Sequence, residues 1–247
     1  PAVVDARLLD LCRMLTLVGG GSACAREALG VIAAPRGSML GTLSLRLADG
    51  SHEPLHADAF AIPGDPLEVL RLRFTQSSAR AILVVEKDAV LRRLAEDGLL
   101  RRFPCVLLTS CGYATLSARA LLMHRAEQLR LPCFALTDWN PHGLAIMLTY
   151  QQGSASRELE RYACPNLCWL GLLSDDVRRI DDETGGGLRR GLVGFSANDL
   201  STLGSLESRA NVAGSASLQA EVAAMRREGS KLDLESLHVV RPRYLVD

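Results

Sequence analysis

Three short apolar runs, separated by stretches with helical spacing, limit what this chain can fold into more than any other feature. The runs are residues 81–85, residues 105–109 and a run that reaches Leu136. They are rich in branched side chains, which is typical of strands buried on both faces of a parallel sheet. Residues 88–98 and 115–129 have helical spacing and fill the gaps. This alternation predicts βαβ units with right-handed crossovers, and so an α/β fold.

Acidic side chains follow two of these predicted strands. Glu86 ends the first run, and Asp138 follows the last run with Asn140 two residues further on. Parallel strands end at one edge of a sheet, where open α/β sheets bind ligands, so we expect Glu86 and Asp138 to lie together. Such oxygen ligands predict a hard cation, most plainly Mg²⁺. A helix cap or a solvated position is the alternative for either carboxylate alone, but Pro141 and Gly143 beside Asn140 favour a site.

Four sequence blocks occur in a fixed order, and together they indicate a family. They are Val-Val-Glu-Lys-Asp at 84–88, Thr-Ser-Cys-Gly-Tyr at 109–113, Asp-Trp-Asn-Pro-His-Gly at 138–143, and Trp-Leu-Gly-Leu-Leu-Ser-Asp-Asp at 169–176. This chain resembles, over residues 28–180, the toprim domain of the A subunit of topoisomerase VI and of its eukaryotic relatives, the meiotic double-strand-break proteins. The resemblance implies a Rossmann-like parallel sheet with flanking helices, preceded by the tail of a winged-helix domain and a β-ribbon linker.

We therefore expect four parts in the chain. Residues 1–34 are the end of a winged-helix domain, 35–76 the β-ribbon linker, 77–180 the toprim domain and 181–247 a C-terminal helical extension. In the linker, residues 39–47 alternate and residues 48–51 predict a hairpin turn, with the partner strand within 55–62 and a helix over 67–74. In the extension, helices are predicted after Ser196 and up to Gly229. Residues 181–183 are expected to be a solvated acidic loop, and Arg119 and Arg125 to face outward from their helix.

The resemblance also implies chemistry. Members of the family cleave DNA by transesterification with a tyrosine of the winged-helix domain, and the tyrosines here, Tyr113, Tyr150, Tyr162 and Tyr244, lack its sequence context. We expect that tyrosine upstream of this chain, or lost. Glu86 and Asp138 match the acidic motifs of the family, and Glu86 is a candidate general acid or base. Asn140 stands where the family usually has Asp, which weakens Mg²⁺ binding by on the order of 1–3 kcal/mol.

Candidate DNA contacts lie beside the same strands. Tyr113 follows the run at 105–109, where an aromatic ring can press on a sugar or base, or instead cover the helix start at Thr115. Lys87 and Arg36 are the neighbouring cations that we assign to DNA. Arg36 precedes Gly37 and Ser38, which fits either a phosphate contact or a solvated loop.

Composition excludes some classes of protein. The formal net charge is zero, so only local clustering of charge can favour nucleic acid. No apolar run is long enough for a membrane span. The seven cysteines show no framework spacing and indicate reduced thiols inside a cell. We expect Cys105 and Cys133 in the core, and no zinc site at Cys164 and Cys168 or at His52 and His56.

The leading hypothesis is a subunit that makes double-strand breaks in double-stranded DNA. It is expected to act as a homodimer together with a topoisomerase VI B-like partner. Its expected location is the nucleus, on the chromosome. The seven cysteines and the presence of only two lysines favour the meiotic role. The alternatives are a DNA-binding scaffold without cleavage, a topoisomerase VI A-type subunit that relaxes DNA, and a receiver-like or nucleotide-binding regulator. Against the regulator, the lysine at a strand end, Lys87, directly follows Glu86.

Overall fold

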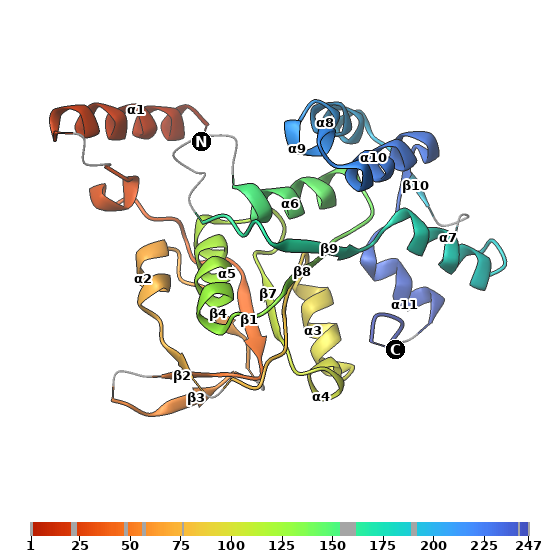
Figure 1. The fold of residues 1–247 in the computed structure, drawn as a ribbon, viewed down its shortest axis with the longest axis horizontal. Helices are drawn as coiled ribbons and strands as arrows, with labels where there is room; N and C mark the ends of the chain where they lie inside the picture. Colours follow the sequence, from red (N-terminus) through yellow and green to blue (C-terminus); the bar gives the residue numbers. More distant parts are fainter. Residues whose placement is uncertain are drawn as a thin grey trace.

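A six-stranded sheet forms the centre of the molecule, and four of its strands run parallel (Figure 1). The computed structural model describes residues 2–20, 24–46, 49–55, 58–75, 77–153, 162–188, 192–241 and 243–246. The strand order is β4-β1-β7-β6-β8-β9. The strands are β1 (Ser38–Gly41), β4 (Phe60–Ala61), β6 (Ile82–Val85), β7 (Val106–Thr109), β8 (Cys133–Leu136) and β9 (Leu167–Gly171). The parallel strands β6 to β9 and their connecting helices confirm the predicted α/β toprim fold.

Helices connect the successive parallel strands. They are α3 (Asp88–Glu96), α4 (Leu99–Arg102), α5 (Leu116–Leu129) and α6 (Pro141–Gln152), with α7 (Ser174–Glu183) after β9. The side chain of Thr115 accepts the Ala118 N–H at 3.1 Å, so α5 begins where the sequence predicted. The N-cap of α3 is Lys87, directly before the helical spacing that begins at residue 88.

Two predictions about charged side chains are wrong. Arg119 and Arg125 on α5 are only 2% and 1% exposed, because each finds partners inside the fold. Arg119 donates to the Tyr162 carbonyl, and the Arg125 guanidinium lies 4.7 Å from the centre of the Phe74 ring. Asp181 is also buried, in the last turn of α7 rather than in a solvated loop. Helical spacing alone did not show that α5 is enclosed on several sides.

The predicted ribbon is divided between two sheets. β2 (Ser44–Arg46) and β3 (His52–Pro54) form a hairpin, but β3 ends before the expected partner strand within 55–62 begins, and β5 (Phe74–Thr75) extends the hairpin to three strands. β1 instead pairs with β7 of the central sheet, and β4, part of the expected partner strand, pairs with β1. The chain passes between the sheets at Gly41, where a Cβ would lie 2.7 Å from the Cys105 carbonyl oxygen. The helix predicted over 67–74 is α2 (Pro66–Arg71), which ends three residues early.

The two ends of the described chain differ in how they pack. The N-terminal helix α1 (Ala2–Val18) is followed by a short 3-10 helix, η1 (Arg26–Leu29). Figure 1 shows α1 set apart from the sheet, and Leu17 and Val18 are more than 80% exposed. Within the described residues, no other element completes an apolar core around α1.

The C-terminal elements pack back onto the sheet. They are β10 (Val193–Gly194), α8 (Ala197–Glu207), α9 (Ala210–Ala213), α10 (Ala216–Glu228), β11 (Ser230–Lys231), η4 (Leu234–Ser236) and α11 (Leu237–Val240). Ser196 caps α8 and Gly229 ends α10 in the left-handed conformation, as predicted. Helix α8 contacts α6, and Leu232 pairs with Trp139 just after β8. The boundaries of the four parts remain predictions, but β1, β4 and the residues after β11 are all joined to the toprim sheet.

Cys105 and Cys133 are buried in the sheet, which confirms that prediction. None of the helices in the described ranges is both long and apolar enough to span a bilayer.

Candidate metal and DNA-binding site

Glu86 and Asp138 lie together at one edge of the parallel sheet, as the sequence predicted. Strands β6 and β8 are neighbours with Val85 opposite Leu136, so both strands deliver their acidic residue to the same edge. The Asp138 N–H donates to Glu86 Oε2 at 2.9 Å. Both residues are buried, with exposures of 8% and 2%. The backbone thus fixes the two carboxylates relative to each other.

Burial makes these two carboxyl groups weaker acids than usual, because it raises the pKa of each. Burial, and then the charge of Asp138, raise the pKa of Glu86 to about 7, although the Asp138 N–H and Lys87 oppose the shift. Burial likewise raises the pKa of Asp138 to about 6, against the N–H of Leu234 and the ammonium of Lys87. Two ionised carboxylates are therefore costly here unless a cation lies beside them.

A cation from the chain itself lies at this edge. Lys87 Nζ is 3.0 Å from Asp138 Oδ2 and 2.6 Å from Glu235 Oε2. Burial would lower the pKa of Lys87, but hydrogen bonds to Glu235 and Asp138 raise it above its usual value. Lys87 was assigned to DNA from the sequence, and that role stays a prediction. In this structure its ammonium lies between the carboxylates of Asp138 and Glu235.

Asn140 begins helix α6 as its N-cap. Its Oδ1 accepts the N–H of Gly143 at 2.7 Å, and the residue is 6% exposed. Gly143 is required at this turn because a Cβ would lie 2.3 Å from the Asp138 carbonyl oxygen. The amide oxygen that the sequence offered to a metal is thus bonded to the helix backbone, and its role as a ligand remains a prediction.

Three groups near Asp138 were missed by sequence reasoning, and all come from the C-terminal segment after β11. The Leu234 N–H donates to Asp138 Oδ1 at 2.9 Å, Glu235 pairs with Lys87, and the charge of Asp233 acts on both buried carboxyl groups. The signal in the sequence is the alternation of leucine with acid over residues 232–235. This alternation indicates a segment with one apolar face, but it does not indicate that the segment packs against Asp138.

The donor set fits a hard cation in part. Toprim domains generally bind Mg²⁺, and Glu86 and Asp138 supply carboxylate oxygens at a point that already attracts the Lys87 ammonium. In the part of the chain that the structure describes, no three His, Cys, Asp or Glu side chains converge as a complete metal site. The absence of a zinc site at Cys164 and Cys168 and at His52 and His56 stays a prediction, and His56 lies outside the described residues. Glu86 and Asp138 are the residues that would hold Mg²⁺.

Tyr113 stands beside this edge in a polar chain of contacts. Its hydroxyl is 2.8 Å from His142 Nδ1, and His142 Nε2 is 3.5 Å from Asp199 Oδ1. The Tyr113 ring is half-exposed. Burial, and then the charge of Glu86, raise the pKa of its hydroxyl. The phenol is therefore a poor nucleophile but presents an open aromatic surface.

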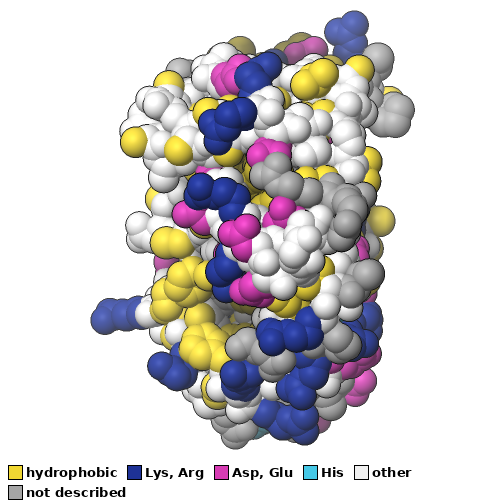
Figure 2. Space-filling model, turned by 90° about the vertical axis from the view of Figure 1, so that its right-hand side faces the viewer, with side chains coloured by type: hydrophobic (Ala, Val, Ile, Leu, Met, Phe, Trp, Pro, Cys, Tyr) yellow, Lys and Arg dark blue, Asp and Glu magenta, His cyan; other side chains and the backbone are white. Residues whose placement is uncertain are grey.

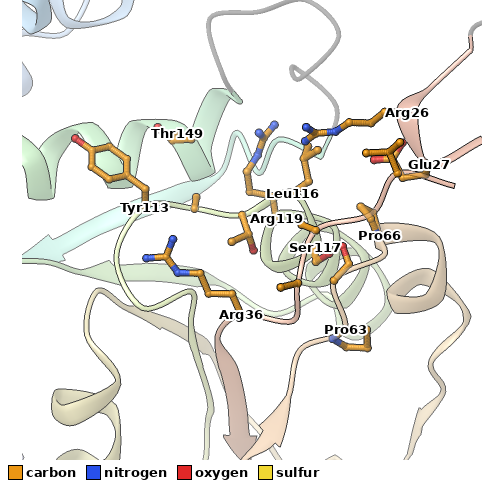
Figure 3. Close-up of a pocket in the computed structure, with 16 residues that line it drawn as sticks. Arg26, Glu27, Arg36, Pro63, Pro66, Tyr113, Leu116, Ser117, Arg119 and Thr149 are labelled. Carbon is orange, nitrogen blue, oxygen red and sulfur yellow. Dashed lines mark hydrogen bonds between the residues drawn. The ribbon is translucent and has the colours of Figure 1, made fainter. Parts of the chain in front are cut away.

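Tyr113 and Arg36 line the same cavity of about 460 Å³, together with Arg26 and Arg119 (Figure 3). Arg36 comes from the segment before β1, and its Nη2 donates to the Cys111 carbonyl at 2.6 Å. The loop that carries Tyr113 is tied to the acidic edge, because the Gly112 N–H donates to the Glu86 carbonyl at 2.8 Å. The structure thus brings two of the three predicted DNA contacts together, next to the carboxylates.

Charge elsewhere on the surface is locally clustered although the net charge is zero. Figure 2 shows Lys and Arg side chains gathered at the lower end of one face, at the level where Figure 1 places α4. Arg101 and Arg102 lie in α4. Higher on this face, acidic and basic side chains lie scattered among hydrophobic and neutral ones. Neutral composition therefore does not argue against a nucleic-acid partner.

The sheet order and the paired carboxylates at its edge define a toprim-type domain. The family model for the Toprim domain of Spo11 and of the A subunit of topoisomerase 6 matches residues 81–247, and the chain belongs to this family.

The relatives carry two kinds of name. The meiotic recombination protein SPO11-2 of Oryza sativa subsp. indica is 47% identical over 164 residues, which are 64% of this chain and 42% of the rice protein. The meiotic recombination protein SPO11 of Mus musculus is 27% identical over 99% of this chain and 59% of its own length. The A subunit of DNA topoisomerase 6 from Arabidopsis thaliana is 34% identical over 70% of this chain and 39% of its own length. The chain thus spans about two fifths of the rice relative.

Proposed function

We propose that this chain is the toprim part of a DNA-cleaving transesterase subunit that makes double-strand breaks in meiosis. The observation that carries the proposal is the buried pair Glu86 and Asp138, fixed at one sheet edge by the 2.9 Å bond from the Asp138 N–H. Membership of the family and the names of the relatives from rice and mouse support the meiotic assignment. The nucleophilic tyrosine is proposed to lie upstream of this chain.

In the proposed reaction, a tyrosine oxygen forms a bond to phosphorus while the bond from phosphorus to the 3′ oxygen breaks. The protein stays on the 5′ end of the DNA. Bound Mg²⁺ would stabilise negative charge on the phosphate and on the departing 3′ oxygen. Glu86 is proposed to donate a proton to that oxygen, and its burial, which in the absence of metal raises its pKa to about 7, supports this role. Asp138 is held in one orientation by the Leu234 N–H.

The cavity lined by Arg36 and Tyr113 is proposed to receive the DNA backbone. Guanidinium groups suit phosphate oxygens, and the half-exposed ring of Tyr113 offers a face for a sugar or base. The loop contact from Gly112 to Glu86 keeps this surface at a fixed place beside the carboxylates. Binding of double-stranded DNA here would present a phosphate to the acidic edge.

The remaining parts of the proposal rest on the relatives. A homodimer would place two such sites on the two strands, and a relative named as one subunit of topoisomerase 6 supports a B-like partner. Relatives named for meiotic recombination support a nuclear, chromosomal location.

The test uses duplex DNA and the full-length protein together with its B-like partner. Wild type is expected to leave protein covalently attached to DNA 5′ ends in the presence of Mg²⁺, and Glu86→Gln and Asp138→Asn are expected to abolish this product. Covalent product that is unchanged in both variants would contradict the proposal.

A second candidate is a DNA-binding scaffold that does not cleave, and the cap at Asn140 favours it. An asparagine engaged with Gly143 leaves the site one acidic ligand short of the pattern that the resemblance implies. This candidate predicts DNA binding by wild type with no covalent product at any Mg²⁺ concentration. Relaxation of supercoiled DNA would instead indicate the topoisomerase VI A-type role.

A further inference from the structure

The C-terminal segment after β11 lies directly on the acidic edge. Leu232 forms an antiparallel bridge with Trp139, with the Trp139 N–H donating to the Leu232 carbonyl at 2.9 Å. Leu232 and Leu234 are buried, so the segment is anchored on both sides of Asp233. Glu235 follows this anchor and remains 43% exposed at its side chain. The fold therefore holds a partly solvated carboxylate beside Lys87.

The two oxygens of Asp138 have different partners. Oδ1 accepts the Leu234 N–H at 2.9 Å, and Oδ2 lies 3.0 Å from Lys87 Nζ. The backbone bond is part of the anchored segment, whereas the lysine side chain is 31% exposed and joined to Asp138 only through its ammonium. Oδ2 is the Asp138 oxygen that does not accept the Leu234 N–H, and the Lys87 ammonium lies on it. A divalent cation that binds Oδ2 therefore meets the charge of Lys87 at the same atom.

We propose that Lys87 is a built-in competitor for the metal and that Glu235 is the positioning residue that receives its ammonium when Asp138 is released. The inference rests on the proposed Mg²⁺ site and concerns how that site is regulated. Lys87 Nζ is already 2.6 Å from Glu235 Oε2, so it can leave Asp138 without losing a charged partner. Glu235 is the carboxylate outside the proposed metal ligands that accepts a hydrogen bond from Lys87, whereas Asp233 acts on Lys87 through its charge.

The side chains around Lys87 in this cluster are acidic, and their negative charge favours a bound cation. Glu86, Asp138 and Asp233 all act on Lys87 or on one another, and Lys87 is the cation that reaches Asp138 within the described residues. Removal of Lys87 leaves these acids uncompensated and should increase their affinity for any other cation. Removal of Glu235 removes the alternative partner and should keep Lys87 on Asp138.

The test is Mg²⁺ binding by calorimetry at fixed ionic strength, with the Mg²⁺-induced rise in unfolding temperature as a second readout. Lys87→Met is expected to bind Mg²⁺ about tenfold more tightly than wild type, and Glu235→Gln about fivefold more weakly. In the Lys87→Met background, Glu235→Gln should change the affinity by less than about twofold, because the residue that it positions is gone. Arg92→Met is the matched control: Arg92 lies on α3 and pairs with Asp88 rather than with Asp138, so the affinity should stay within about twofold of wild type.

Several results would overturn the inference. One is a wild type that binds Mg²⁺ through Glu86 and Asp138, together with a Lys87→Met variant that binds it no more tightly. Another is an equal effect of Glu235→Gln in both backgrounds, which would assign Glu235 to general charge alone. If Lys87→Met does not fold, Lys87→Gln replaces it. Glu235→Gln changes a partly exposed side chain and is measured in either case. A wild type that binds no Mg²⁺ at all would overturn the proposed metal site as well.

Discussion

The acidic edge at Glu86 and Asp138 and the arginine-lined cavity at Arg36 and Tyr113 are adjacent, yet they are built in opposite ways. The carboxylates are buried and held by backbone N–H groups, with one ammonium beside them. In the cavity, the half-exposed Tyr113 ring faces solvent, and guanidinium groups donate to loop carbonyls, as Arg36 does to Cys111.

This difference indicates two kinds of binding. A cation gains most where water is excluded and the donors are fixed, because its charge is then poorly screened. A DNA backbone is long and variable, so it is better met by exposed charges that adjust to it. Variants in each region measure whether the two are as separate in function as they are in construction.

The largest expected effect is the loss of cleavage when either buried carboxylate is neutralised. Asp138→Asn and Glu86→Gln should each lower Mg²⁺-dependent formation of the covalent product by about a thousandfold or more, because a metal contributes several kcal/mol of charge stabilisation. Asp175→Asn is the control, since its side chain is 78% exposed on α7 and pairs with Arg178. DNA binding without metal should change little. A parallel loss of DNA binding would show that the two regions are not separate.

The pH dependence of stability is the next effect in size. Glu86 has a raised pKa in the folded chain, about 7 against 4.5, so the folded state binds a proton that the unfolded state releases. The contribution of Glu86 to stability in the absence of Mg²⁺ should therefore fall as pH rises from about 4.5 to 7, by on the order of 3 kcal/mol, and level off above. Urea unfolding of wild type and Glu86→Gln across this range, with a chelator present, measures the difference. If the free energy of unfolding depends on pH in the same way in both proteins, burial does not raise the pKa of Glu86.

A smaller effect is expected from the cavity. Tyr113→Ala should weaken binding of duplex DNA by about tenfold, which corresponds to one lost aromatic contact. Tyr113→Phe keeps the ring and loses only the bond to His142, so it should bind within about threefold of wild type. Arg36→Ala should reduce the slope of the logarithm of the binding constant against the logarithm of salt concentration by about one. Binding by Tyr113→Ala that equals wild type would assign Tyr113 to covering the start of α5.

Sequence reasoning reached the acidic edge because a strand end is a local signal. The branched run before Glu86 and the pattern from Asp138 to Gly143 are both contiguous, and parallel strand order brings them together. The Asn140 cap was readable in the same pattern, since asparagine before proline is a common helix start.

What was missed depends on long-range packing. Nothing near Lys87 in the sequence shows that its partner is Glu235, 148 residues later. The ribbon was misread for a similar reason: residues 39–47 alternate evenly, and only the contact of Gly41 with Cys105 divides them between two sheets. Arg125 was assigned to the surface because a charged residue is usually exposed, whereas Phe74 of a distant strand covers it.

The smallest effect concerns Asn140, which stands between the two regions. The charge argument alone predicts that Asn140→Asp strengthens Mg²⁺ binding about tenfold or more, but its oxygen accepts the Gly143 N–H. Aspartate caps a helix as well as asparagine does, so the new carboxylate should stay on the backbone and act only as a nearby charge. We expect about a threefold gain in affinity by calorimetry with little change in stability, whereas Asn140→Ala should lose about 1 kcal/mol of stability to urea. A gain of about tenfold or more in Asn140→Asp, with a loss of stability that matches Asn140→Ala, would show that the side chain leaves the helix for the metal.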